Sequence, residues 1–322
     1  MTTAAPEVIS SVPQAAPNRP KRNFGRAGNR WPIGLAFCMP MIVGLCALTI
    51  YPVAASFWFS VNDYPVLQPP AYIGVENYRE LATDSRAWLS LWNTAYFAIF
   101  AVPLGMFVGL MLALLLNLKI KGMAFYRTMF FLPSIVPLIA TCVLWQEILH
   151  PDRGLLNTVL RSLFSLCHLD LAPPRWLSHE LWAKPGLVLM SVWGCGGGMV
   201  LYLAALQDVP QELYESAALD GAGGWQRLRH ITLPMISPVL LFTGVMGLIG
   251  TMQYFAQAYV MTNGTGRPND ATLVYALHLF NMAFMEFRLG YASAMAWVMF
   301  VIILLGTLVL MKMSNRYVYY HS

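Results

Sequence analysis

The stretch PQELYESAALDGAGGWQRLRHITLP, residues 210–234, is the long polar interruption in the apolar C-terminal half of the chain. It predicts a helix, a turn and a second helix. Asp208 is a suitable N-cap for the first helix, Pro210 suits its first turn, and the Gln211 side chain can reach back to the amide of the cap. We therefore expect a polar helical hairpin between two apolar runs.

The first predicted helix has an apolar face that becomes flat toward its end, because Leu213, Ala217 and Gly221 recur at four-residue spacing. Small residues there let another surface approach the backbone closely. We expect Pro234 to close the module before the next apolar run. On pattern alone, a solvated amphipathic loop between two membrane helices remains an alternative. Three glycines can adopt the positive φ that ends one helix and starts the next: Gly221, Gly223 and Gly224.

The order of residues in 210–234 resembles the EAA loop of the permease subunits of binding-protein-dependent ABC sugar importers. In that family the loop is cytoplasmic, and its helix docks in a cleft of the ATP-hydrolysing subunit. Ser216 stands where the family has its first Ala, a small-for-small change that we do not expect to alter docking. The matching residues are Glu215, Ser216, Ala217, Ala218, Asp220, Gly221, Ala222, Ile231, Leu233 and Pro234.

The resemblance implies a role for each part of this module in coupling to the ATPase. It assigns Glu215 and Asp220 to polar contacts or local capping at the ATPase interface. It assigns Ala217, Ala218 and Gly221 to close docking. The predicted coupling set is completed by Ile231, Leu233 and Pro234.

The composition places the chain in a membrane. Of its 322 residues, 57% are hydrophobic and 11% are charged, well below the roughly 25% charge of soluble domains. Residues 1–30 are rich in Pro, Ala and Ser and then basic, so we expect a disordered cytoplasmic tail rather than a cleaved signal peptide or a nucleic-acid site. We predict a transmembrane domain over 31–313, with the EAA loop at 208–234, and a cytoplasmic C-terminal tail over 314–322.

Six apolar runs reach about the 20 residues needed to cross a bilayer, so the predicted fold is all-α with six transmembrane helices. Pro133 and Pro137 are expected to kink the third run. Residues 271–285 are apolar but short, which favours a re-entrant or interfacial segment, and 155–164 favours a short interfacial helix. The six runs are 31–62, 87–118, 128–146, 185–207, the central part of 231–266, and 289–311.

The distribution of basic residues predicts that both termini are cytoplasmic. With that orientation, 12 of the 20 Lys and Arg residues lie inside. Five are in the N-terminal tail, three in the turn after the second run, two in the module and two after the sixth run. Because Lys and Arg near spans stay in the cytoplasm, this count also places the 208–234 module there, between helices 4 and 5.

The resemblance to the sugar-importer permeases extends from about Pro32 to Lys312. IGVENYREL at 73–81, FYRTMFFLPSIVP at 125–137 and MTNGTGRPNDATLVYALHLFNMAF at 261–284 match family segments in order. The basic tail and first span look most like the first of the two permeases in such systems. The resemblance implies alternating access in the bacterial inner membrane, with four kinds of partner besides lipid: a second six-helix permease, an ABC ATPase dimer, an extracytoplasmic solute-binding protein and a carbohydrate.

No sequence motif supports catalysis by this chain. A GxxxxGK[ST] phosphate loop is absent from the sequence, so we expect ATP and Mg to be used by the partner ATPase and no cofactor to be bound here. The six histidines are scattered without HExxH, the five cysteines have no paired spacing, and no serine lies in a GxSxG elbow. We therefore predict no catalytic and no metal-binding residue.

Two groups of uncharged residues are candidates for contact with a substrate. The GCGGG run at 194–198 predicts either close helix packing or a locally broken helix whose freed backbone groups meet a polyhydroxy solute. The polar residues near the end of the fifth run can hydrogen-bond hydroxyls or join helices to one another. The predicted substrate residues are Trp193, which could stack on a sugar ring, Gly194, Gly197, Thr251, Gln253, Tyr254 and Gln257.

Two alternatives remain open from the sequence. The nearer is the same importer with a phosphorylated polyol or an amino acid as its cargo, although no basic residue lies within the predicted spans to favour phosphate. The farther is a stand-alone secondary transporter or membrane enzyme. The absence of a charged residue deep in any predicted span argues against a proton-coupled carrier.

Overall fold

The structure, a computed structural model, describes residues 31–118 and 120–317. The chain divides into two units, Met1–Val53 and Ala54–Ser322. The described part of the first unit holds α1 (Trp31–Leu45), a π-helical turn (Cys46–Ile50) and the start of α2 (Tyr51–Ser60). The predicted tail over 1–30 lies outside the described residues.

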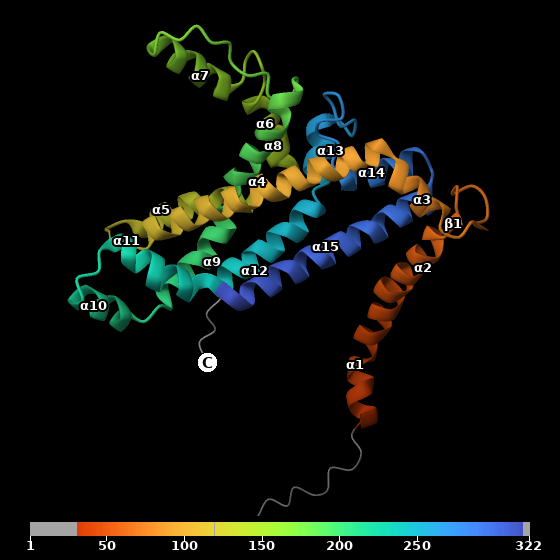
Figure 1. The fold of residues 1–322 in the computed structure, drawn as a ribbon, viewed down its shortest axis with the longest axis horizontal. Coiled ribbons are helices and arrows are strands. Elements are labelled where there is room, and N and C mark those ends of the chain that lie inside the picture. The colour runs from red at the N-terminus through yellow and green to blue at the C-terminus, as the bar shows by residue number, and fades with distance from the viewer. Residues whose placement is uncertain (1–30, 119, 318–322) are drawn as a thin grey trace, which may run out of the picture. The chain divides into compact units, whose positions relative to one another are not determined.

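The second unit contains the remaining elements, which Figure 1 labels in chain order. The two strands pair antiparallel over two residues each, so the fold is all-helical apart from this small ribbon. The elements are β1 (Asn62–Asp63), β2 (Ala71–Tyr72), α3 (Glu76–Thr83), α4 (Ser85–Leu116), α5 (Met123–Phe131), η2 (Leu132–Ile135), α6 (Leu138–Ile148), α7 (Leu155–Leu166), α8 (Glu180–Trp193), α9 (Gly196–Gln207), α10 (Gln211–Leu219), α11 (Gly224–Arg227), η3 (Leu228–Thr232), α12 (Leu233–Met252), α13 (Ala256–Thr262), α14 (Tyr275–Phe280), η4 (Asn281–Met285) and α15 (Leu289–Tyr317).

The described residues contain about six apolar spans, as predicted. Four helices are long and apolar enough to cross a membrane, and two further pairs of helices qualify as bent spans. The four are Gly34–Ser60, Ser85–Leu116, Gly224–Met252 and Leu289–Ser314. The bent pairs are Met123–Ile135 with Leu138–Ile148, at 97°, and Glu180–Trp193 with Gly196–Gln207, at 47°.

The predicted kink of the third span is confirmed. Val136 and Pro137 are extended between η2 and α6, with ψ of 131° and 137°. Proline has no N–H for a helical hydrogen bond and disfavours helical geometry in the residue before it, so the helix breaks here. The short helix predicted near 155–164 is also present, as α7.

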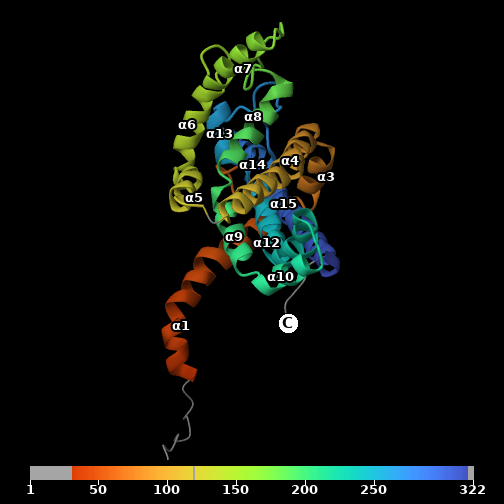
Figure 2. The ribbon, with the colours of Figure 1, turned by 90° about the vertical axis from the view of Figure 1, so that its left-hand side faces the viewer.

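Helix α4 is the centre of the packed unit. It contacts α8, α9, α12 and α14, and α15 packs against α12 and α3. Figures 1 and 2 show α4 running beside α9 and α12 in both views. One hydrophobic cluster joins the C-terminal half of α4 to α9 and the start of α12, through Ala113, Met199, Tyr202 and Ile236. These contacts place α4, α9 and α12 against one another near the 210–234 module.

The first helix of the module begins differently from the prediction. Helix α9 continues to Gln207, so Asp208 is its C-cap and Pro210 is the N-cap of α10. Asp208 therefore does not cap α10. The Gln211 side chain donates to Glu215 Oε1 at 2.9 Å instead of reaching back. That reach-back occurs at the second helix, where the Gly223 N–H donates to Gln226 Oε1 at 2.8 Å.

The second half of the module is continuous with the fifth span, and the prediction that Pro234 closes the module is wrong. One helical run extends from Gly224 to Met252. It passes through the π turn η3, where the Leu233 N–H donates to the Leu228 carbonyl. This wider turn accommodates a proline that cannot donate its own hydrogen bond. Of the three glycines expected to have positive φ, Gly221 does, at +78°.

A polar network joins the N-terminal end of α4 to α14 and α15. Asp84 caps α4, because its Oδ1 accepts the Arg86 N–H at 2.8 Å. Its Oδ2 accepts the Tyr291 hydroxyl at 2.6 Å and lies 3.5 Å from Nε2 of buried His278. Burial raises the pKa of Asp84, but the hydrogen bonds from Tyr291, the backbone and His278 outweigh it and hold that pKa below its ordinary value. Burial lowers the pKa of His278.

The segment predicted as re-entrant or interfacial forms α14 and η4 and is attached to α4. Asn93 Nδ2 donates to the carbonyls of Asp270 and Leu273, at 2.8 and 2.9 Å. The Thr94 hydroxyl accepts the Tyr275 N–H at 2.8 Å. Since Asn93 and Thr94 are fully buried, these bonds fix the start of α14 on the first turns of the second span.

Candidate functional site

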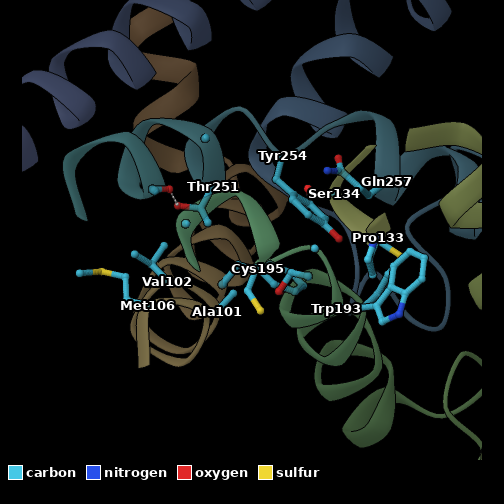
Figure 3. Close-up of a pocket in the computed structure, with 18 of the residues that line it drawn as sticks. Ala101, Val102, Met106, Pro133, Ser134, Trp193, Cys195, Thr251, Tyr254 and Gln257 are labelled. Carbon is cyan, nitrogen blue, oxygen red and sulfur yellow. Dashed lines mark hydrogen bonds between the residues drawn. The ribbon is translucent and has the colours of Figure 1, made fainter. Parts of the chain in front are cut away.

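A cavity of about 590 Å³ lies where the broken spans meet α4 and the end of α12. Its walls come from α4, the η2–α6 break, the α8–α9 break and the α12–α13 connection. Figure 3 shows Trp193, Tyr254 and Gln257 among the side chains around this space. The volume falls in the range of ~300–1,000 Å³ typical of small-molecule sites.

Five of the seven predicted substrate residues line this cavity: Trp193, Gly194, Thr251, Tyr254 and Gln257. The structure places the other two, Gly197 and Gln253, outside its lining. Both are exposed elsewhere. Successive residues on a helix point about 100° apart, so neighbours in one sequence run cannot all face one space.

The glycine run coincides with the break between α8 and α9 and also permits close helix packing. Gly194 and Gly198 line the cavity at the break between α8 and α9. Gly196 permits close packing, because a Cβ there would lie 2.5 Å from the Phe130 carbonyl oxygen and 3.1 Å from the Phe131 Cα. A Cβ at Gly197 would meet nothing within 4 Å. The requirement for glycine is therefore strongest at Gly196.

Aromatic rings form part of the cavity wall. The Tyr254 ring stacks on Phe97, with centroids 5.2 Å apart and planes at 17°. Trp193 meets Trp145 edge to face at 6.3 Å. The Tyr254 hydroxyl is buried and has no hydrogen-bond partner among the described residues. A buried hydroxyl without a partner costs about 1–3 kcal/mol.

Several other hydroxyls of the lining are bonded within the protein. Thr251 Oγ1 donates to the Gly247 or Leu248 carbonyl, at 2.9 and 3.0 Å. The Tyr202 and Thr243 hydroxyls bond each other at 2.8 Å. No charged residue is among the lining side chains of the described chain. Aromatic faces beside neutral polar groups suit a ligand that combines hydroxyls with apolar ring surfaces.

Sequence reasoning missed the contributions of the second and third spans to this cavity. Phe97 on α4 carries no signal that separates it from an ordinary apolar residue. Ser134, Thr141 and Ser191 also line the cavity. Each is an uncharged polar residue in an apolar run, the same signal that identified the residues of the fifth span.

The module at 210–234 is the second candidate site, and its first helix is largely open to solvent. Glu215 and Ala218 on α10 are exposed, and Ala217 is half-buried. Asp220 is the C-cap, and Gly221 in the left-handed region turns the chain toward α11. These positions form a small-residue surface with acidic groups beside it.

The later residues of the module face the permease itself. Ile231 and Leu233 pack against the cluster that includes Met199 and Tyr202 on α9. Pro234 is half-buried at the second position of α12. Their side chains therefore anchor the base of the fifth span.

Comparison with known proteins identifies the family. Residues 101–319 match the family described as "Binding-protein-dependent transport system inner membrane component". "Probable ABC transporter permease protein YesP" of Bacillus subtilis is 40% identical over 291 residues, covering 90% of this chain and 92% of that protein. "Lactose transport system permease protein LacF" of Rhizobium radiobacter is 33% identical, over 84% of this chain and 89% of that protein.

The chain belongs to the binding-protein-dependent ABC importer permeases. As a member of this family, it is a multi-pass inner-membrane permease subunit and not the catalytic subunit of its importer. A solved bacterial alginate ABC transporter, in complex with an alginate pentasaccharide-bound periplasmic protein, has the same fold. Its similar chain superposes with a TM-score of 0.75 at 22% identity, covering 89% of this permease and 95% of that chain.

Proposed function

We propose that this permease forms part of the pathway for a carbohydrate and works by alternating access. The observation that carries this proposal is the uncharged cavity lining, in which aromatic rings lie beside a neutral polar group, the Gln257 side-chain amide. A sugar offers hydroxyls to such a group and an apolar ring face to Trp193. An uncharged lining suits this class of substrate better than a phosphate ester or an amino acid.

The relatives support a carbohydrate by what their names say of them. LacF is named for lactose, and MalF of Thermococcus litoralis, 31% identical over 88% of this chain, for trehalose and maltose. SmoG of Agrobacterium fabrum, 32% identical over 85% of this chain, is named for sulfoquinovosyl glycerol. The sugars differ, so the relatives support the class of substrate and not its identity.

The module supports the second part of the proposal, that α10 is a cytoplasmic coupling helix for an ABC ATPase dimer. The exposed tip of the module includes Leu219 at 90% and Trp225 at 72% of full exposure. Large apolar side chains exposed together are typical of a surface that binds another protein. The basic residues near the spans favour an orientation with this module and both termini in the cytoplasm.

Coupling between the two sites runs through α12 in this proposal. The base of α12 is anchored by Ile231 and Leu233, and its later turns contribute Thr243, Gly247 and Thr251 to the cavity. A displacement of α10 is thus transmitted along one continuous helix. The proposed assembly contains a second six-helix permease, an ATPase dimer that uses ATP and Mg, and an extracytoplasmic solute-binding protein.

The experiment is ATP hydrolysis by the chain reconstituted in lipid with its neighbouring permease, ATPase and binding protein. The titrants are mono-, di- and oligosaccharides, glycerol phosphate and amino acids. Stimulation by a sugar class supports the proposal. A response confined to the phosphate ester or an amino acid retains the importer and overturns the sugar, and failure of any ATPase to assemble overturns the coupling role.

A matched pair of variants tests whether the cavity is the substrate site. We expect Gln257→Ala to raise the sugar concentration for half-maximal stimulation about 3- to 10-fold, because it removes one neutral hydrogen bond worth roughly 1 kcal/mol. Gln253→Ala removes the same group four residues away, outside the cavity, and should change this value less than about 2-fold. Equal effects of the two variants contradict the assignment.

A further inference from the structure

A second cavity, of about 360 Å³, lies between α10, the start of the Gly224–Met252 helix and the end of α4. It lies within the module and shares no lining residue with the cavity described above. Its lining residues are Leu114, Tyr214, Gly224, Arg227, Leu228 and Thr232.

Arg227 is the charged residue of this lining, and its side chain has no ion-pair partner among the described residues. The side chain is half-buried, and its Nε is buried without a hydrogen bond to any described residue. None of the ion pairs among the described residues includes it. The Arg127 Nε is likewise buried without a hydrogen bond to any described residue, but the Arg127 Nη2 donates to the Leu116 carbonyl at the end of α4, at 3.0 Å. A partly desolvated cation without a counter-charge is unfavourable. Contact with a negatively charged group would therefore stabilise the Arg227 side chain.

The acidic residues of the same module do not supply the missing charge. Glu212, Glu215 and Asp220 belong to α10 and its C-cap, and none of them forms an ion pair with Arg227 in the described chain. Glu215 instead accepts a hydrogen bond from Gln211. No counter-charge for Arg227 is therefore found among the described residues.

We propose that Arg227 receives a carboxylate side chain of the ATPase subunit. This proposal rests on the docking of α10 proposed above. The cavity wall includes Tyr214 of α10, so a subunit that grips α10 can reach Arg227 between the two arms of the module. The planar guanidinium offers paired N–H donors that match the two oxygens of a carboxylate.

This contact ties docking to the base of the fifth span. The Thr232 hydroxyl bonds the Tyr214 hydroxyl at 3.0 Å and donates to the Arg227 carbonyl at 3.4 Å. Thr232 ends the π turn that leads into α12. A carboxylate bound at Arg227 thus holds α10, the π turn and α12 as one unit, and acts as a second contact beside the exposed face of α10.

The first experiment measures retention of the purified ATPase by the assembled permease pair in nanodiscs of neutral lipid. We expect Arg227→Gln to weaken retention at least about 10-fold, the loss of one charge-assisted contact. Arg229→Gln, two residues along and exposed, should change it less than about 2-fold. Retention by the unaltered pair should fall more steeply with salt than retention by Arg227→Gln. Thermal melting of each permease pair without ATPase identifies a variant that fails to fold.

The second experiment identifies the partner atom. In Arg227→Lys, a carbodiimide joins the introduced amine to any carboxylate in contact with it, and mass spectrometry locates the resulting amide. A cross-link to an Asp or Glu of the ATPase, absent from Arg229→Lys, supports the proposal. Unchanged retention by Arg227→Gln together with no such cross-link overturns it.

Three further outcomes separate this inference from the docking of α10 and from binding to lipid. If the unaltered pair retains no ATPase, the docking of α10 fails and the Arg227 contact fails with it. If retention depends on α10 but not on Arg227, docking stands and this inference alone is wrong. If Arg227→Gln instead abolishes only a dependence on anionic phospholipid, the counter-charge is a lipid phosphate and the ATPase carboxylate is excluded.

Discussion

The regions at the two ends of α4 differ in whether their charged side chains form ion pairs. Around its N-terminus, charged side chains pair within the protein: Arg86 with Asp270, and Glu80 with Arg288, while Asp84 lies beside the His278 ring. Around its C-terminus, in the module at 208–234, no ion pair is found among the described residues. We call the N-terminal end complete, because its ion pairs form within the protein, and the module end incomplete, because its charged side chains form no ion pair among the described residues.

This difference separates residues that hold the fold from residues that await a partner. At the complete end, buried Asn93, Thr94 and Tyr275 extend the network into the core. At the incomplete end, α10 has no buried residue. A substitution at the first end should therefore reduce stability, whereas one at the module should reduce assembly and coupling while the fold persists. Four predictions test this division, in order of decreasing effect.

The largest effect is expected for Gly221→Asp, which should abolish substrate-stimulated ATP hydrolysis while leaving membrane insertion and melting nearly unchanged. Gly221 has φ of +78° and open space where a Cβ would lie. The new carboxylate would stand beside Asp220 on a surface proposed to dock closely. Gly221→Asn has the same size and tolerates this φ without the charge, so it should retain more coupling. Normal transport by Gly221→Asp would sink the docking assignment.

Asp84→Ala should reduce stability and leave coupling to the ATPase intact. It removes the N-cap of α4 and the acceptor of the Tyr291 hydroxyl, and we expect the free energy of unfolding to fall by about 2–3 kcal/mol. Thermal melting of the purified complex measures this change. Asp84→Asn keeps a cap and an acceptor and should lose less. Activity per folded molecule should be preserved, and a loss of coupling at full stability would contradict the division.

A pair of tyrosines tests the cavity between the two ends. Tyr254→Phe removes a buried hydroxyl that has no partner among the described residues, so it should keep or raise the melting temperature, while we expect the sugar concentration for half-maximal stimulation to rise about 5- to 10-fold. Tyr202→Phe removes a hydroxyl bonded to Thr243, so it should destabilise the fold by about 1 kcal/mol. Melting curves and sugar titrations of both variants distinguish the two roles. A stability loss for Tyr254→Phe would mean that its hydroxyl has a structural partner.

The smallest effect is a pH dependence of stability that originates at the complete end. His278 has a pKa lowered from 6.5 by burial, and Asp84 has a pKa below 3.8. In both cases the unfolded chain binds its proton first as pH falls. Stability is therefore fully present above about pH 6.5 and decreases below it, first through His278 and later through Asp84.

Thermal melting between about pH 8 and about pH 2 measures this dependence. His278→Gln should flatten the decrease that begins near pH 6.5 and leave the later one. Arg229→Gln in the module, which lacks contact with this network, should leave the whole curve unchanged. A profile in which His278→Gln changes nothing contradicts the assignment.

Much of the local architecture could be predicted, because it depends on signals that neighbouring residues carry. The apolar runs, the break at Pro133 and Pro137 and the turn at Gly221 all follow from residue chemistry over short stretches. The exact boundaries could not be predicted in the same way. Asp208 proved to end one helix instead of starting the next, because packing of α9 extended that helix to Gln207.

The sequence by itself determined the membrane class, the number of apolar spans and the polar module whose residue order identifies the family. Tertiary structure alone decided which side chains share the cavity, because that depends on how broken helices rotate against α4. Thus Tyr254 and Gln257 line it while Gln253 does not, and Phe97 joins them from a position 157 residues before Tyr254 in the chain. The same packing left Arg227 without a counter-charge. Local sequence patterns predict helices and turns, because these depend on neighbouring residues. The contacts of a side chain also depend on segments far away in the sequence, which no local pattern includes.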